Sequence, residues 1–308
     1  ILIVCSAAIA DFPSFNWTNM LTSSQESGGG HLGNAISYLR DRFDTGSNQP
    51  SFIDNQLKKF GFNSQRPSVI AIPEQFDARR RWPSCPSIGK VHSQGCCSSD
   101  YAFAVTSMLT DRSCTYSNGS VTRTFSTYDP LTCCEECMLF RADPCAGGYV
   151  SKVLQFARKV GIVEEDCLPY SSGSVCSSND LTCPRMCNSE GKYVADNRRT
   201  VTKVIALESV VNNIKYEIME NGPVVASFKL CDDYLEYGRG VYVGKAERCV
   251  GIHSFKVIGW GQEEGMDYWL AVDSLGESWG ESGIVKFRMN QLDVEKHMYA
   301  VVPKVQTG

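Results

Sequence analysis

The sequence HSQGCCSSDYAF, residues 92–103, has the form of a loop that runs directly into a helix. Ser99 and Asp100 are residue types that favour helix N-termini, and apolar residues recur at helical spacing between Ala102 and Leu109. A loop of this shape carries a nucleophile in many enzymes. Here an aspartate, Asp100, stands where a reactive side chain is expected.

The segments on either side of this helix indicate an α+β protein. Further helical patterns cover residues 149–159 and 207–221. Beyond Gly222 the pattern changes to short β-rich segments separated by Gly and charged turns: PVVASFKL, GVYVG, HSFKVIGWG, DYWLAVDS and GIVKFRM. Helices followed by an antiparallel sheet or barrel predict two lobes.

Composition limits the classes of protein that fit. The chain has 308 residues, of which 43% are hydrophobic and 21% charged, as in globular proteins of one large or two smaller domains. A net charge of −4 without a dense Lys/Arg run argues against a nucleic-acid partner. Outside the N-terminus no stretch approaches the roughly 20 apolar residues of a membrane span.

The N-terminal region is predicted to be a secretory leader. Residues 1–10, ILIVCSAAIA, read as a truncated signal peptide, with a buried strand as the alternative. Residues 11–71 are rich in Gly, Ser and Asn and poor in motifs. Glycosylation sequons at Asn16 and Asn118 fit a secretory route. We therefore expect a protein of the secretory pathway, extracellular or lysosomal.

The fifteen cysteines indicate either disulfides or a metal site. CCEEC, residues 133–137, and CPRMC, residues 183–187, could supply the four thiolates of a zinc site. A secretory start and the many other cysteines favour disulfides. The total is odd, and removal of Cys5 with the signal peptide would make it even.

Eight blocks of sequence resemble, in order and spacing, the papain-like cysteine proteases, and most closely those of cathepsin B type. They are IPEQFDARRRWPSCP, QGCCSSDYAF, DRSC, LTCCEEC, CAGGY, NGPVVASF, GIHSFKVIGWG and YWLAVDSLGESWGESGIVKF. The resemblance covers about residues 72–303. It implies a papain-like two-lobed domain at 72–308, with a helical lobe at about 84–185 and a β-barrel lobe at about 186–303. It also implies that residues 11–71, which include FIDNQLKKFGF, are a propeptide.

In that family a cysteine thiolate at a helix N-terminus attacks the substrate, and a histidine and an asparagine assist it. The histidine position matches His253, and the glutamine that helps to hold the oxyanion matches Gln94. The nucleophile position falls on Asp100 and the asparagine position on Asp273. The tryptophan that shields the asparagine is replaced by Leu275.

The resemblance therefore predicts a homologue without peptidase activity. A carboxylate of low pKa at Asp100, with Asp273 on the other side, should keep His253 protonated and unable to act as a base. Attack by a carboxylate suits activated substrates, and a cation between two carboxyls would prevent the mechanism of the aspartic proteases. Shifting the alignment to make Cys97 the nucleophile would break the anchors on both sides.

The family pattern also suggests which residues form the cleft. Gly147 and Gly148 match its glycine wall, whereas glycine positions fall on Ser98 and Ile252, and Ile252 should narrow the cleft. Glu295 matches an acidic residue in a pocket for basic side chains, with a solvated surface glutamate as the alternative.

One feature of cathepsin B is missing from this sequence. Six residues, SSNDLT, separate Cys176 from Cys183, where cathepsin B carries an insertion with two histidines. The carboxydipeptidase action that depends on those histidines should therefore be absent.

The resemblance also pairs ten cysteines: Cys85–Cys114, Cys97–Cys145, Cys133–Cys183, Cys134–Cys137 and Cys167–Cys187. By the same comparison Cys176 has lost its partner, and Cys96, Cys231 and Cys249 are additional. One or two pairs among these four are expected, and the pairing stays open.

The expected partners are a peptide or protein in the cleft and an inhibitor of cystatin type. No cofactor or metal is expected, and the protein should be a monomer. Two alternatives are an active peptidase with altered chemistry and an extracellular structural or adhesive protein. His31, His92 and His297 are interpreted as surface or structural residues.

Overall fold

The computed structural model describes residues 71–304, except 141–142, 178–180, 189–190 and 246–247. The chain divides into two units, Ile1–Ala71 and Ile72–Gly308, and the fold described below is that of the second. The predicted signal peptide, almost all of the predicted propeptide, Asn16 and His31 lie outside the described residues. Among the helices that are described, none has the length and hydrophobicity needed to cross a membrane.

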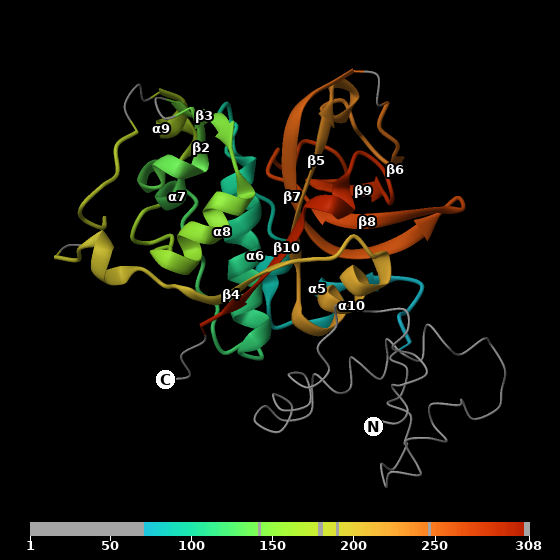
Figure 1. Cartoon of the computed structure of the whole chain (residues 1–308), viewed down its shortest axis with the longest axis horizontal. Helices are drawn as coiled ribbons and strands as arrows, with labels where there is room; N and C mark the ends of the chain where they lie inside the picture. The colour runs from blue at the N-terminus through green and yellow to red at the C-terminus, as the bar shows by residue number, and fades with distance from the viewer. Residues whose placement is uncertain (1–70, 141–142, 178–180, 189–190, 246–247, 305–308) are drawn as a thin grey trace, which may run out of the picture. The chain divides into compact units, whose positions relative to one another are not determined.

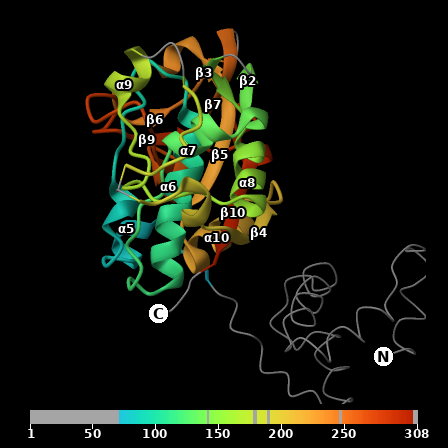
Figure 2. The same ribbon diagram turned by 90° about the vertical axis from the view of Figure 1, so that its left-hand side faces the viewer.

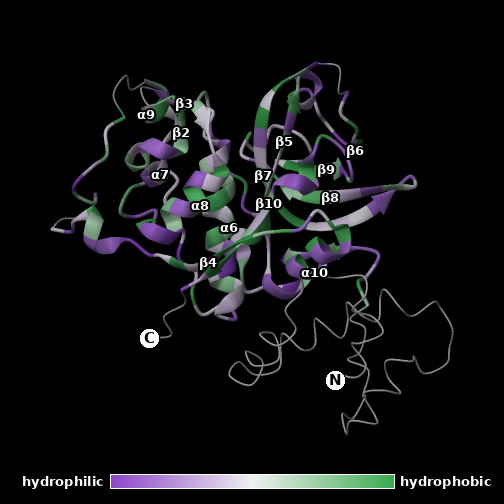
Figure 3. Ribbon diagram, in the orientation of Figure 1, coloured by the Kyte–Doolittle hydropathy of each residue, from purple (hydrophilic) through white to green (hydrophobic). Residues whose placement is uncertain are grey.

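The second unit has a helical side and a sheet side, as predicted (Figure 1). The helical side contains α6 (Asp100–Tyr116), α7 (Tyr128–Cys133), α8 (Val150–Lys159), α9 (Ser172–Ser177), η3 (Glu135–Cys137), η4 (Val194–Asn197) and the hairpin of β2 (Met138–Phe140) and β3 (Asp143–Gly148). Green and purple residues both lie along α8 in Figure 3, because that helix buries one face and exposes the other.

The sheet side is an eight-stranded sheet in the order β4-β10-β5-β7-β8-β9-β6, with β1 paired to β7. Its strands are β1 (Phe76–Asp77), β4 (Val201–Ala206), β5 (Val224–Cys231), β6 (Val241–Tyr242), β7 (Cys249–Glu263), β8 (Met266–Val272), β9 (Ile284–Arg288) and β10 (Met298–Pro303). Five of these correspond to the five predicted segments. Short helices α5 (Ala78–Arg81), α10 (Val211–Asn221), η2 (Pro86–Gly89), η5 (Asp232–Tyr234) and η7 (Val294–His297) complete the described elements.

Helix α6 lies between the other helices and the sheet (Figures 1 and 2) and buries 15 of its 17 residues. Burial on all sides explains why two of its charged residues need buried partners. Asp111 forms an ion pair with Lys256 of β7, with Oδ2 and Nζ 2.6 Å apart. Arg112 donates to the carbonyls of Gly222, Pro223 and Val301 and to the carboxylate of Glu217. These contacts join the two lobes through one helix.

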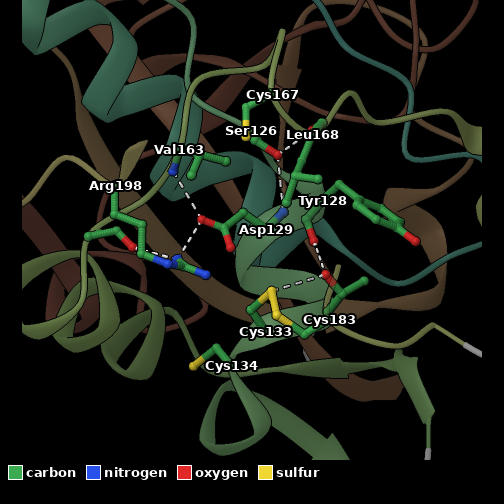
Figure 4. Close-up of polar contacts among 12 residues, drawn as sticks. Ser126, Tyr128, Asp129, Cys133, Cys134, Val163, Cys167, Leu168, Cys183 and Arg198 are labelled. Carbon is green, nitrogen blue, oxygen red and sulfur yellow. Dashed lines mark hydrogen bonds and ion pairs between the residues drawn. A yellow bond between two sulfur atoms is a disulfide. The ribbon is translucent and has the colours of Figure 1, made fainter. Parts of the chain in front are cut away.

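A second buried ion pair organises the helical lobe, as Figure 4 shows. Oδ2 of Asp129 in α7 accepts hydrogen bonds from the Val163 amide at 3.0 Å and from Nη1 of Arg198 at 2.7 Å. Nη1 of Arg198 also donates to the Gly161 carbonyl. The carboxylate therefore ties α7 to two segments that follow α8, which sequence patterns gave no reason to join.

The five cysteine pairs that the resemblance implied are all present. The four remaining cysteines form two pairs, at the upper end of the expected number: Cys176 bonds to Cys96, and Cys231 bonds to Cys249. The sulfurs considered for zinc are thus held in disulfides. Within the described ranges no cluster of three or more His, Cys, Asp or Glu residues could hold a metal ion.

Candidate functional site

The structure brings together Asp100, His253 and Asp273, which are far apart in the sequence. Nδ1 of His253 lies 3.6 Å from Oδ2 of Asp100, and its Nε2 lies 3.0 Å from Oδ1 of Asp273. All three residues are buried, with 6%, 4% and 2% of their surface exposed. The imidazole is therefore held between two carboxylates, one at each ring nitrogen.

These three residues, called the row below, each occupy a fixed place in the fold. Asp100 is the first residue of α6 and the only acidic residue in its first turn. His253 lies in β7 opposite Phe228 of β5, which also contacts the imidazole ring. Asp273 follows β8 directly, and its amide donates to the Gly283 carbonyl. A helix from one lobe and two strand segments from the other thus meet at the row.

Tyr234 is a member of this site that the sequence analysis missed. Its hydroxyl donates to Oδ2 of Asp273 at 2.6 Å, and its ring contacts the imidazole of His253. The Ser274 amide donates to Oδ1 of Asp273 at 2.7 Å. In sequence Tyr234 is one of several aromatic residues near β5, and nothing distinguishes it until η5 is placed beside Asp273.

The pKa of Asp100 differs from the sequence-based prediction, whereas the protonation of His253 agrees with it. Burial raises the pKa of Asp100 to about 6, although the positive charge of His253 opposes this shift. The expected low pKa for Asp100 was therefore wrong, because the cost of burying a carboxylate exceeds the benefit of the helix N-terminus. Burial also acts against protonation of His253, but Asp273 and then Asp100 outweigh it and raise the pKa of His253 to about 9. A cationic His253 agrees with expectation.

Gln94 is joined to the same cluster through Ser274. The Ser274 hydroxyl donates to Oε1 of Gln94 at 2.7 Å, and the Gln94 amide donates to the Ser274 carbonyl at 2.8 Å. Nε2 of Gln94 donates to the Cys97 carbonyl at 3.0 Å. The carboxamide of Gln94 is therefore buried, and it is held by Ser274 after β8 and by Cys97 before α6.

Comparison with known proteins places this arrangement in a family. The model of the papain family cysteine proteases matches residues 72–303. This chain belongs to the papain family.

Its relatives include cathepsin B-like proteins. It is 35% identical over 254 residues to cathepsin B-like cysteine proteinase 3 of Caenorhabditis elegans, an alignment that covers 77% of this chain and 67% of that protein. The gut-specific cysteine proteinase of the same organism is 33% identical over 252 residues, with 77% and 75% coverage. The solved structure of proCathepsin B S9 from Trypanosoma congolense aligns with a TM-score of 0.70 and 27% identity, over 77% of this chain and 80% of that one. The papain-like fold is thus confirmed.

In this papain-family chain the two glycines expected in the cleft wall have different surroundings. Gly147 has a positive φ of 104°, and a Cβ added there would meet nothing within 4 Å. A Cβ on Gly148 would collide with the Cys137 carbonyl and the Tyr101 ring. Gly147 therefore faces open space, whereas Gly148 is required by packing.

The other expected wall residues lie close to the row. Ile252 precedes His253 and is 71% exposed, and Val250, on the same face of the strand, is 74% exposed. Leu275 is half-buried and pairs with Ser93, the neighbour of Gln94. Ser98 is exposed. The first residues of β7, next to His253, thus present apolar side chains to solvent.

Glu295 and Asn118 lie elsewhere in the fold. The alternative of a solvated surface glutamate was wrong for Glu295, which is 6% exposed. Its Oε1 accepts hydrogen bonds from the Trp269 indole and the Asn290 amide, each at 2.8 Å. Asn118 is exposed in the turn after α6, and its glycosylation stays a prediction.

Proposed function

We propose that this chain is a cathepsin B-like member of the papain family that does not hydrolyse peptides and instead binds a peptide or protein at the surface around Asp100. One observation carries the proposal: the first residue of α6 is an aspartate whose Oδ2 lies 3.6 Å from Nδ1 of His253. The eight sequence blocks align this position with the nucleophilic cysteine of the family.

The chemistry of the row supports inactivity. A general base must accept a proton, and a histidine with a pKa of about 9 already carries one at neutral and acidic pH. A thiolate could replace the missing nucleophile only if a cysteine were free. All fourteen cysteines of the described residues are paired, including Cys96 with Cys176 and Cys97 with Cys145. A relocated cysteine nucleophile is therefore not supported.

Features near the row support ligand binding. The open side of Gly147 and the exposed Ile252 and Val250 offer backbone access and apolar contact to an extended peptide. We assign Gly147, Gly148, Ile252 and Leu275 to this surface, and we include an inhibitor of cystatin type among the candidate ligands. Residues 11–71 would act as the propeptide of a secreted or lysosomal protein.

An activity assay on the unmodified chain, with residues 11–71 present and after their removal, tests this proposal. We expect no turnover of a dibasic fluorogenic peptide between pH 5 and pH 8, because neither a thiolate nor a neutral imidazole is present. Turnover that disappears on Asp100→Ala substitution would contradict the proposal.

The matched control restores the family's chemistry. In the double variant Asp100→Cys, Asp273→Asn, both carboxylates that hold the proton on His253 are gone and a thiol faces Nδ1. We expect thiol-dependent cleavage from this variant and none when His253→Ala is added. Such a result would show that the fold around the row is competent and that the chemistry alone is missing.

A further inference from the structure

A cavity of about 380 Å³ lies in the helical lobe beside α6, outside the row of Asp100, His253 and Asp273. Its walls come from the face of α6 that carries Thr106, Ser107 and Thr110, from the loop that leads to Gln94, from the segment around Thr124 and from the segment between Glu165 and Ser172. The volume falls within the range of small-molecule sites, roughly 300–1,000 Å³. Nothing described above accounts for it.

The α6 wall of the cavity is made of hydroxyl groups that act as acceptors. The hydroxyls of Thr106, Ser107 and Thr110 donate to backbone carbonyls of the same helix, at 3.0, 2.7 and 2.8 Å. Thr110 Oγ1 already accepts from the Phe125 amide at 3.0 Å and Thr106 Oγ1 lies 2.8 Å from the Thr127 hydroxyl, so each keeps one lone pair for a ligand, whereas both lone pairs of Ser107 Oγ are available. This wall therefore suits a molecule with several O–H donors.

His92 supplies a complementary group. It lines the cavity, and the described residues provide no hydrogen-bond partner for its ring. Burial, together with the charges of Lys256 and Lys90, lowers the pKa of His92 to about 4. The imidazole is therefore neutral above pH 5 and has one N–H donor and one acceptor nitrogen to offer.

The cavity also has an aromatic wall. The rings of Phe103 and Tyr170 pack edge to face with centroids 4.6 Å apart, and His92 lies 5.5 Å from Phe103. Phe125 lines the same space. Aromatic faces beside hydroxyl acceptors suit a ligand with C–H surface and O–H groups, such as a sugar ring.

The charges near the cavity argue against an ionic ligand. Glu165 is the one charged side chain among the lining residues, and its Oε1 already accepts a hydrogen bond from the Tyr170 amide at 2.7 Å. An anionic ligand would be repelled by the Glu165 carboxylate and would find no Lys or Arg among the lining residues. A cationic ligand would be repelled by the positive charges of Lys90 and Lys256, which already disfavour protonation of His92.

We propose that this cavity binds a neutral, polyhydroxylated molecule of monosaccharide size, held by the hydroxyls of α6, the imidazole of His92 and the aromatic wall. The inference is independent of the proposed inactivity, because it uses no residue of the row.

Occupancy of the cavity would be communicated to the row through Tyr170. The Tyr170 hydroxyl donates to the Gln94 carbonyl at 2.8 Å and lies 3.1 Å from the hydroxyl of Ser99, the residue before Asp100. A ligand against the Tyr170 ring therefore touches a side chain that positions both Gln94 and the start of α6.

Histidine resonances provide a direct test, because the chain has only four histidines. Glucose, mannose and myo-inositol would be titrated into the full chain at pH 6.5 while the Hε1 signals are followed by NMR. His92→Gln assigns the His92 signal, and His297, which is exposed, serves as the internal reference. We expect a saturable shift of the His92 signal and no shift of the His297 signal.

Charged analogues and a matched pair of variants complete the test. Glucosamine and glucose 6-phosphate should bind at least about tenfold more weakly than glucose. Ser107→Met, which fills the cavity, should weaken binding by a similar factor, whereas Ser151→Met on the exposed face of α8 should leave it unchanged. The proposal is overturned if no neutral compound shifts His92, if a charged analogue binds better, or if Ser107→Met binds like Ser151→Met with the same thermal stability.

Discussion

His253 has a carboxylate at each ring nitrogen, so the proton that it carries is part of the folded structure. Its position between Asp100 and Asp273 was predictable from the sequence, because block spacing aligns all three residues. The raised pKa of Asp100 was not predictable, because it depends on a burial that the sequence does not show. Tyr234 was missed for the same reason: its hydroxyl matters only once η5 lies beside Asp273.

The protonation of His253 predicts a loss of stability at high pH. Its pKa is about 6.5 in an unfolded chain and about 9 in the fold, so the folded state binds the proton more tightly. The stabilisation is complete below pH 6.5 and is lost as the pH rises through 9. The shift corresponds to a loss on the order of 3 kcal/mol in the free energy of unfolding. Urea unfolding at a series of pH values measures it.

Asp100→Asn is the control for that measurement. Removing one of the two carboxylates lowers the folded-state pKa of His253 toward its unfolded value of about 6.5, so the loss of stability should still begin near pH 6.5 but should end at a lower pH and be smaller. An unchanged pH profile in Asp100→Asn would show that Asp100 does not affect the ionisation of His253.

Among the elements, α6 connects the row of Asp100, His253 and Asp273 with Asp111 and Arg112, whose side chains contact the sheet side. The sequence predicted the start of this helix from its capping residues and apolar spacing. It did not predict β4 and β10, because β4 exposes half of its residues and is held mainly by pairing with β10, almost a hundred residues later. Pairing between segments so distant in sequence leaves no local pattern to detect.

Arg112 should be among the most sensitive positions of α6. Its side chain is fully buried and donates to three carbonyls and one carboxylate from the sheet side of the domain. Arg112→Ala leaves these acceptors without their donor, and we expect a loss of about 3–5 kcal/mol in the free energy of unfolding.

Chemical denaturation measures this loss, and Arg79→Ala provides the comparison. Arg79 pairs with Asp77 but is 40% exposed, so its removal should cost less than about 1 kcal/mol. Equal losses in the two variants would show that the buried contacts of Arg112 do not hold the lobes together.

At the scale of the whole molecule, seven disulfides tie the described residues together, and they differ in exposure. Both residues of Cys96–Cys176 are exposed, whereas Cys85–Cys114 and Cys167–Cys187 are buried at both ends. The family resemblance supplied five pairs. It gave no guidance for Cys96–Cys176, because the approach of α9 to the Gln94 loop depends on the folded chain.

Exposure predicts the order in which the disulfides are reduced. Exposed disulfides exchange more readily with added thiols, so mild reduction should open Cys96–Cys176 before Cys85–Cys114. Peptide mapping by mass spectrometry, with alkylation after short exposure to dithiothreitol, checks both the pairing and the order. Free Cys85 before free Cys96 would contradict the prediction.

The row of Asp100, His253 and Asp273 also changes charge with pH. With both carboxylates ionised beside the imidazolium, the row carries one net negative charge. Because the pKa of Asp100 is about 6, that charge is present at neutral pH and largely absent near pH 5. A basic group of the peptide ligand proposed above would therefore be attracted less strongly in acid, so the same three side chains would favour its capture at neutral pH and its release in acid.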